Sequence, residues 1–308
     1  MTGIPQGSSV RRAITVGQAL TAARRRLENA AVESAHVEAR RLLALALDVD
    51  PQQVVMERDR PLSRNQEGRV TRLVERRIAG EPLQHIEGTA AFRDLVLSCD
   101  GRALIPRPET EQLVELINGW ARRRGGSGPL RMARPPVSTV LDIGTGSGAI
   151  ALALLSERTA GRALGLDVSA DALAVARENR RLSGLENRFD LAACGPDPYA
   201  ALERGRRFEV IVSNPPYVRD SELARLQPEV RWHEPRIALS GGADGLAVIR
   251  RIVRGARGRL EPGGALFLEV GAGQGNPVAD LLVGAGPWSA VTVRADLADR
   301  DRFVVAEV

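Results

Sequence analysis

A glycine-rich turn, with acids before and after it, is the first segment of this sequence that could perform chemistry. The stretch Val140-Leu141-Asp142-Ile143-Gly144-Thr145-Gly146-Ser147-Gly148 leads from an apolar run into a helical pattern. Glycines let the backbone approach a ligand closely, and a helix start offers free N–H groups. The next apolar run ends at Asp167, whose carboxylate can accept both hydroxyls of a ribose. Together these features predict a nucleoside-binding site.

The spacing of the glycines bears on the choice of cofactor. A dinucleotide fold normally carries G-x-G-x-x-G, whereas this turn is G-x-G-x-G with an acid before it. A carboxylate there suits a cationic ligand and opposes a phosphate. S-adenosylmethionine (SAM) carries an ammonium and a sulfonium and no pyrophosphate, and the turn resembles motif I of class I methyltransferases. We therefore expect SAM rather than NAD, bound by Asp142, Gly144, Thr145, Gly146, Ser147, Gly148 and Asp167.

Methylation of a planar NH₂ group is the chemistry indicated by a second motif, Asn214-Pro215-Pro216-Tyr217, which follows the apolar run 208–213. Prolines donate no backbone hydrogen bond and cannot continue a central strand, so the chain must leave the sheet with its carbonyls exposed. The side-chain oxygen of Asn214 and the carbonyl of Pro215 can each accept one N–H and aim the nitrogen at a methyl donor. Tyr217 can stack on the planar group. We expect Asn214, Pro215 and Tyr217 to be catalytic, all four residues to bind the substrate, and Asn214 also to contact the cofactor.

The elements that must position these motifs form an α/β domain. From Val137 onward, short apolar runs alternate with helical stretches, which is typical of a parallel sheet covered on both faces. Ligands of such sheets bind beyond the carboxyl ends of the strands. The predicted strands are 139–143, 163–166, 210–212 and 265–270, with an antiparallel edge from 290–294 and 302–308 and helices that include 169–182 and 244–254.

A small helical bundle is predicted for residues 1–88. Thr15 with Gln18 and Ser63 with Gln66 have the spacing of capping boxes, and Asp50-Pro51 supplies an N-cap and a first-turn proline.

Residues 89–106 change to an alternating pattern, in which Asp100-Gly101 offers a tight turn, so we expect a β-hairpin that joins the bundle to a domain over 107–308. The latter begins with a helix opened by Arg107-Pro108, and the Gly/Arg/Pro-rich stretch 122–136 is expected to be an exposed loop.

Composition excludes several functional classes. The 308 residues are 44% hydrophobic and 26% charged, with no apolar run long enough to span a bilayer and no signal peptide at the start, so we expect a cytoplasmic protein without a membrane partner. Cys99 and Cys194 are expected to be buried free thiols, and the scattered histidines indicate no metal site. The net charge of +5 and 3% aromatic content do not indicate a nucleic-acid partner.

Further motifs resemble the PrmC/HemK family, the peptide chain release factor N5-glutamine methyltransferases. The resemblance covers the chain from about Thr15 to its end. It is carried by the segments Gly80-Glu81-Pro82-Leu83-Gln84-His85-Ile86-Glu87-Gly88, Leu104-Ile105-Pro106-Arg107-Pro108-Glu109-Thr110-Glu111, Glu234-Pro235-Arg236-Ile237-Ala238-Leu239, Gly241-Gly242-Ala243-Asp244-Gly245, Pro262-Gly263-Gly264 and Glu269-Val270-Gly271.

The resemblance implies a seven-stranded Rossmann-like class I methyltransferase domain behind a helical substrate-recognition domain. It also implies methyl transfer from SAM to the glutamine of the Gly-Gly-Gln motif in class 1 release factors. Tyr199 stands where the family has an aromatic residue near the adenine, but the segment 194–199 departs from the family pattern, so either Asp197 or Tyr199 is the adenine contact. The segment Arg107 to Thr110 borders the active site in the family, although a helix start with a linker arginine explains it equally well.

Two alternatives stay open at this point. The altered segment 194–199 leaves room for a ribosomal-protein glutamine or a small biosynthetic amine as the substrate. Adenine N6 methylation of nucleic acid would use the same corner, but it requires base flipping and a phosphate-binding surface.

Overall fold

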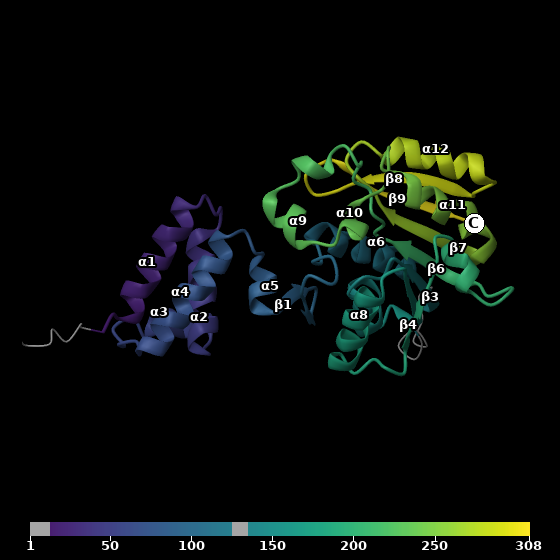
Figure 1. Ribbon diagram of the computed structural model, residues 1–308. Coiled ribbons are helices and arrows are strands. Elements are labelled where there is room, and N and C mark those ends of the chain that lie inside the picture. The colour runs from purple at the N-terminus through teal and green to yellow at the C-terminus, as the bar shows by residue number, and fades with distance from the viewer. Residues whose placement is uncertain (1–12, 125–134) are drawn as a thin grey trace, which may run out of the picture. The chain divides into compact units, whose positions relative to one another are not determined.

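The computed structural model in Figure 1 describes residues 13–124 and 135–308. The chain divides into two compact units, Met1–Glu87 and Gly88–Val308. Most of the loop expected at 122–136 lies outside the described residues, and its first three residues continue a helix instead.

The first unit is a bundle of helices with its own core. Both predicted capping boxes are confirmed, because the Thr15 and Ser63 side chains each accept the backbone N–H of the glutamine three residues later. Asp50 caps the next helix, with Pro51 in its first turn. Leu27, Leu42 and Leu43 are fully buried in the core. The helices are α1 (Val16–Asn29), α2 (Ala35–Leu47), α3 (Pro51–Met56), α4 (Arg64–Ile78) and α5 (Leu83–Glu87).

A β-hairpin opens the second unit, but its turn is not where the sequence suggested. Strand β1 (Thr89–Phe92) pairs antiparallel with β2 (Leu95–Ser98), so the hairpin reverses at Arg93-Asp94. The chain does turn at Asp100-Gly101, where the Ala103 N–H donates to the Asp100 carbonyl, but this turn follows the second strand and does not close the hairpin. Arg93 adopts a positive φ of 52°, and its backbone N–H donates to Glu111 at 3.0 Å. This turn is held by a contact with a residue distant in the sequence, which is why the local sequence did not predict it.

The main sheet has the seven strands that the family resemblance implied, in the order β5-β4-β3-β6-β7-β9-β8. The first five strands of this order run parallel, and β9 pairs antiparallel with both β7 and β8, which confirms the predicted edge. The strands are β3 (Val137–Ile143), β4 (Ala160–Asp167), β5 (Phe189–Ala193), β6 (Phe208–Ser213), β7 (Leu260–Glu269), β8 (Ala290–Ala295) and β9 (Asp301–Glu307).

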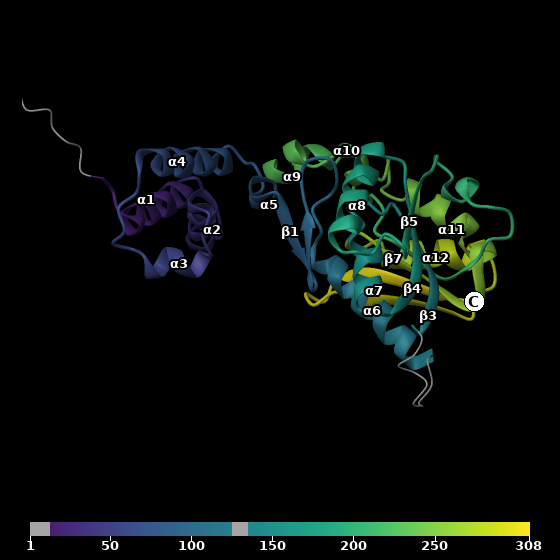
Figure 2. The ribbon, with the colours of Figure 1, turned by 90° about the horizontal axis from the view of Figure 1, so that it is seen from below.

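Helices cover both faces of this sheet, as Figures 1 and 2 show. One face packs on α6 (Pro108–Arg124) and α7 (Ala149–Ser156), with α8 (Ala170–Leu182) beside them against β4 and β5. The other face packs on α11 (Ala247–Arg259) and α12 (Gly275–Ala285).

Successive strand residues point to opposite faces, so alternate side chains enter the two cores. Leu141 and Ile211, for example, face α11, whereas Val140 and Val210 face α6 and α7.

Two details differ from the sequence analysis. Helix α11 begins at Ala247 rather than at 244, because Gly245 has a φ of +80°, which helical backbone cannot adopt. Strand β5 was missed, since among its five residues only Phe189 is buried and its apolar signal is therefore weak.

The chain between β6 and α11 crosses the carboxyl edge of the sheet through two short helices, α9 (Pro228–His233) and α10 (Arg236–Leu239).

Candidate active site

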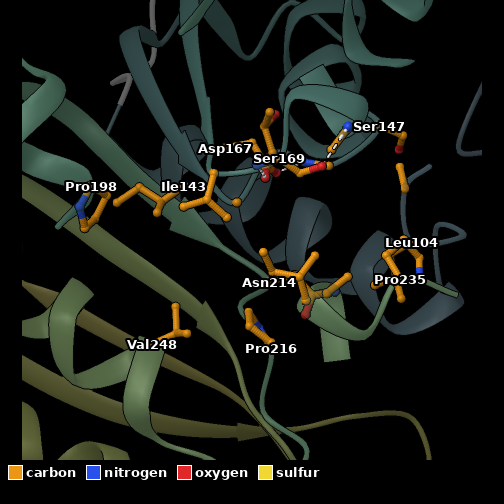
Figure 3. Close-up of a pocket in the computed structure, with 18 of the residues that line it drawn as sticks. Leu104, Ile143, Ser147, Asp167, Ser169, Pro198, Asn214, Pro216, Pro235 and Val248 are labelled. Atoms are coloured by element: carbon orange, nitrogen blue, oxygen red, sulfur yellow. Dashed lines mark hydrogen bonds between the residues drawn. The ribbon is translucent and has the colours of Figure 1, made fainter. Parts of the chain in front are cut away.

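A cavity of about 820 Å³ lies at the carboxyl ends of the parallel strands. Figure 3 shows Asp167 and Ser169 on one side of it and Asn214 and Pro216 on another. The sequence-predicted glycine turn, strand-end acid and asparagine corner therefore meet around one space. The wall also includes residues from the segments 102–110, 194–198 and 235–240 and from α11.

The glycine turn joins β3 to α7 and forms part of the cavity wall. Gly144, Gly146 and Gly148 have φ values of +69°, +57° and +83°, a region that other residues rarely adopt. A Cβ atom on Gly148 would lie 3.0 Å from the Phe189 ring and 3.3 Å from Leu152, so packing also requires glycine there. The three glycines therefore allow the backbone of the turn to adopt the conformation in which it lines the cavity.

Asp142 lies on the side of the glycine turn away from the cavity, where it bonds Thr145, and it does not line the cavity. It is completely buried, and its Oδ2 accepts a hydrogen bond of 2.8 Å from the Thr145 hydroxyl. Burial raises the pKa of Asp142 to about 7. The side chain predicted to face a cationic ligand is thus placed one layer behind the turn.

Asp167 ends β4 and faces the cavity. Its Oδ2 accepts the Gly146 N–H at 2.9 Å, and its Oδ1 accepts the Ser169 N–H at 2.9 Å. Burial raises the pKa of this carboxyl group above its ordinary value. Each carboxylate oxygen keeps lone-pair capacity after one such bond, so two neighbouring hydroxyl groups can still be bound.

The asparagine corner follows β6, whose last residue, Ser213, donates from its hydroxyl to the Ile143 carbonyl at 2.6 Å. That bond fixes the corner beside the glycine turn. Asn214 and Pro216 line the cavity, and Pro215 is buried behind them. The Asn214 Nδ2 group donates to the Thr110 hydroxyl at 3.0 Å.

Tyr217 is not part of the cavity wall. Its ring centroid lies 6.0 Å from the guanidinium carbon of Arg302, and its carbonyl accepts from the Gln274 side chain at 3.0 Å. Burial raises the pKa of the Tyr217 phenol to about 12. The structure therefore does not bring Tyr217 to the position where it was expected to stack on a substrate.

Tyr199, expected near an adenine, is turned into the protein core. Its hydroxyl donates to the Ile252 carbonyl at 2.8 Å, and its ring packs so closely on Gly255 that a Cβ there would lie 2.3 Å away. Pro196 and Pro198 line the main cavity, while Tyr199 and Asp197 border a smaller hollow of about 290 Å³.

Several residues of the site were given no role in it by the sequence analysis, although Glu234 and Glu269 stand in segments that carry the family resemblance. Glu269, at the end of β7, is 1% exposed, and its Oε2 accepts from the Thr110 hydroxyl at 2.8 Å. Glu234 is buried and forms an ion pair with Arg107 of the cavity wall. Cys194 is half-buried and lines the cavity, so the expectation that both thiols are buried holds for Cys99 alone. These contacts join residues far apart in the chain, which no local pattern reveals.

Two further findings concern the described ranges 13–124 and 135–308. No helix in them is both long and apolar enough to cross a membrane. They also contain no cluster of three or more histidine, cysteine or acidic side chains able to hold a metal ion.

The cavity fits SAM. Its volume exceeds 300 Å³, the lower end of the range for small-molecule sites. Glycines of positive φ give close backbone approach, Asp167 retains acceptors for ribose hydroxyls, and Ile143, Val248 and Ile252 supply apolar wall.

The sheet order, the glycine turn and the acid at the end of β4 define a class I SAM-dependent methyltransferase. Residues 18–88 match the family model of the PrmC N-terminal domain, and residues 130–228 match that of the methyltransferase small domain. The chain belongs to the PrmC family of release factor glutamine methyltransferases.

Individual relatives agree with this assignment. A release factor glutamine methyltransferase of Cereibacter sphaeroides is 41% identical, over 94% of this chain and 97% of that protein. The release factor glutamine methyltransferase of Bradyrhizobium diazoefficiens is 40% identical, over 94% of this chain and 95% of that protein. Among solved structures, a methyltransferase from Pyrococcus furiosus is similar over 70% of this chain and 90% of that protein's chain. The TM-score is 0.50 and the sequence identity is 17%, so the similarity shows a shared fold.

Proposed function

We propose that this protein transfers a methyl group from SAM to the side-chain nitrogen, N5, of the glutamine in the Gly-Gly-Gln motif of class 1 release factors. The observation that carries the proposal is the placement of the Asn214 carboxamide on the wall of the cavity that Asp167 and the glycine turn also line. The names of the relatives supply the substrate class. Release factors act in translation, so the proposal also places the protein in the cytoplasm.

In this proposal the backbone of the glycine turn and the Asp167 carboxylate bind SAM. The turn residues are Gly144, Thr145, Gly146, Ser147 and Gly148. Asp167 accepts the ribose hydroxyls with the lone pairs that Gly146 and Ser169 leave free. Asp142 acts indirectly, by holding Thr145. The adenine lies against Ile143, Pro198 and Val248 rather than Tyr199.

The asparagine corner binds the substrate amide. An amide nitrogen is a poor nucleophile because its lone pair is delocalised into the carbonyl. The Asn214 Oδ1 and the Pro215 carbonyl accept the two N–H bonds and thereby hold the nitrogen in line with the methyl group. SAM supplies an activated methyl group with a neutral sulfide as the leaving group. The proton leaves after transfer, when the nitrogen has become acidic, so no strong base is required.

The helical unit is proposed to recognise the protein substrate. We assign residues 1–88 to substrate recognition, 89–106 to the link and 107–308 to methyl transfer. The match of residues 18–88 to the PrmC N-terminal domain supports a role specific to this family.

Labelling tests the proposal directly. The purified protein is incubated with methyl-labelled SAM and a class 1 release factor, and a release factor whose motif glutamine is replaced by alanine serves as the control. Label should appear on the intact factor alone. Labelling of both factors, of neither, or only of an added ribosomal protein or adenine-containing RNA would overturn it.

A further inference from the structure

Three side chains from three separate parts of the fold form a continuous hydrogen-bonded chain that runs from Asn214 and Thr110 on the cavity wall to Glu269 behind it. Asn214 Nδ2 donates to Thr110 Oγ1 at 3.0 Å, and Thr110 Oγ1 donates to Glu269 Oε2 at 2.8 Å. Thr110 lies in the first turn of α6, Glu269 ends β7, and Asn214 follows β6. Thr110 is 4% exposed and Glu269 is 1% exposed, so the bond between them is shielded from water, and the bond to Asn214 is partly buried at the cavity wall.

The number of hydroxyl protons determines which way the Asn214 carboxamide faces. A threonine hydroxyl has one proton, and an ionised carboxylate can only accept. With that proton given to Glu269, the Thr110 oxygen can only accept, so it selects the NH₂ end of the Asn214 amide. The oxygen end, Oδ1, is left for another partner. Without this selection, the two orientations of an amide have nearly the same shape.

We propose that Thr110 and Glu269 are positioning residues that keep Asn214 turned with Oδ1 available to accept an N–H of the substrate amide. The inference rests on the proposed function for the identity of that substrate. In the opposite orientation Asn214 would present two N–H donors to the two N–H donors of the substrate amide. That arrangement provides no hydrogen bond and would expel the nitrogen from its reactive position.

A second trio in the same unit, in which Asn118 and Thr159 are buried and Glu157 is partly buried, shows that the order of the three groups sets which end of the asparagine amide the threonine bonds. Asn118 Nδ2 donates to Glu157 Oε2 at 2.6 Å, and the Thr159 hydroxyl donates to Asn118 Oδ1 at 2.5 Å. Here the carboxylate contacts the asparagine directly, so the threonine bonds the oxygen end. Near the cavity the carboxylate contacts the threonine, and the amide is turned the other way. None of the three residues of this second trio lines the cavity.

The orientation of the Asn214 amide therefore depends on Glu269 being ionised. Burial raises its pKa to about 7, and Glu109 also opposes its ionisation, while the Thr110 hydroxyl, Arg302 and Arg107 favour it. The neighbouring Tyr217 phenol has a pKa of about 12 and is therefore uncharged when Glu269 ionises. A neutral Glu269 could donate its own proton to Thr110, which would free the hydroxyl to donate to Asn214 Oδ1. Turnover should then rise with pH through about 7, as Glu269 ionises.

Kinetics with four variants tests the inference. Thr110→Val and Glu269→Gln should each lower kcat about tenfold or more, while the Kd for SAM stays within about twofold. Thr110→Ser keeps the hydroxyl and should retain kcat within about threefold of wild type. The matched control, Thr159→Val, removes a similar buried hydroxyl from the second trio and should lower the melting temperature while leaving kcat unchanged. Wild-type kcat in Thr110→Val or Glu269→Gln at pH 8, or equal loss in Thr110→Ser and Thr110→Val, would overturn it.

A spectroscopic measurement keeps the inference separate from the choice of substrate. In protein labelled with ¹⁵N-asparagine, the side-chain NH₂ pair of Asn214 is identified by its absence in Asn214→Ala. Its proton shifts should match wild type in Thr110→Ser and move in Thr110→Val and Glu269→Gln. Unchanged shifts in those two variants would contradict the positioning role. If the shifts move but no release factor is methylated, the orientation of Asn214 stands and the proposed substrate fails.

Discussion

Asp167 is joined to Gly146 by a hydrogen bond of 2.9 Å from the glycine N–H to the carboxylate Oδ2. The bond connects the end of β4 to the turn that follows β3, two segments separated by helix α7. A second N–H, that of Ser169, holds the other oxygen. The acid thus fixes the shape of the turn and faces the cavity at the same time.

Asp167→Asn should weaken SAM binding. The amide has one NH₂ group that must face the N–H of either Gly146 or Ser169, so one backbone bond is replaced by two opposed donors. We expect the Kd for SAM to rise roughly tenfold to a hundredfold, because hydrogen bonds to charged groups contribute about 1.5–3 kcal/mol. Isothermal titration calorimetry gives the Kd. Asp190→Asn, which removes an exposed ion pair with Arg162 on the same sheet, is the control and should leave the Kd unchanged. Equal Kd values for Asp167→Asn and wild type would show that the acid does not contact SAM.

Asn214→Ala should separate SAM binding from methyl transfer. The side chain contributes an acceptor for the substrate amide, whereas the turn and Asp167 hold the cofactor. We expect kcat to fall about a hundredfold to a thousandfold, as for loss of a donor or acceptor that orients a reacting group. The Kd for SAM should change little. Transfer of labelled methyl to release factor measures kcat, and near-normal turnover would contradict the role given to the asparagine corner.

The sequence predicted the position of the motifs better than it predicted the side-chain contacts around them. The glycine turn, Asp167 and the asparagine corner are local patterns at strand ends, and parallel strands bring their carboxyl ends to one edge, so their meeting could be foreseen. Capping boxes such as Thr15 with Gln18 are likewise local, and the structure has them where they were expected.

Side-chain direction and long-range contacts could not be foreseen. Tyr199 was one of two residues, with Asp197, expected as the adenine contact, yet its hydroxyl bonds to Ile252, 53 positions further along the chain. The bond between Thr110 and Glu269 spans 159 positions, and no spacing rule connects such residues. The hairpin turn at Arg93 depends on Glu111 in the same way.

Tyr199→Phe tests the position of this ring. Because the hydroxyl bonds inside the core, its removal leaves the Ile252 carbonyl without that donor and should lower the free energy of unfolding by about 1 kcal/mol. The Kd for SAM should stay the same. Urea unfolding and calorimetry on the same preparation measure the two quantities. A weaker SAM complex with unchanged stability would instead place the tyrosine at the adenine.

Arg107 and Glu234 give a prediction that depends on pH. The Glu234 side chain is 1% exposed, its Oε2 has no hydrogen-bond partner among the described residues, and Arg107 is its ion-pair partner. Burial raises the pKa of Glu234 above its usual 4.5 even with Arg107 present. A raised carboxyl pKa means that the folded state holds the proton more tightly, so the stability it contributes is present at low pH and is lost as pH rises through the folded-state pKa.

Arg107→Ala removes the cation that opposes this rise. The pKa of Glu234 should climb further, so the variant should be about 3 kcal/mol less stable than wild type at pH 8, where the buried carboxylate has no partner. At pH 5, closer to the usual range of a carboxyl pKa, a larger fraction of the folded variant carries the proton on Glu234, and the difference should shrink. Urea unfolding at both pH values measures it. Adding Glu234→Gln to Arg107→Ala removes the charge and should restore much of the stability at pH 8. A loss of the same size at both pH values, unrelieved by the second change, would mean that Arg107 stabilises the cavity wall by packing rather than by neutralising a buried charge.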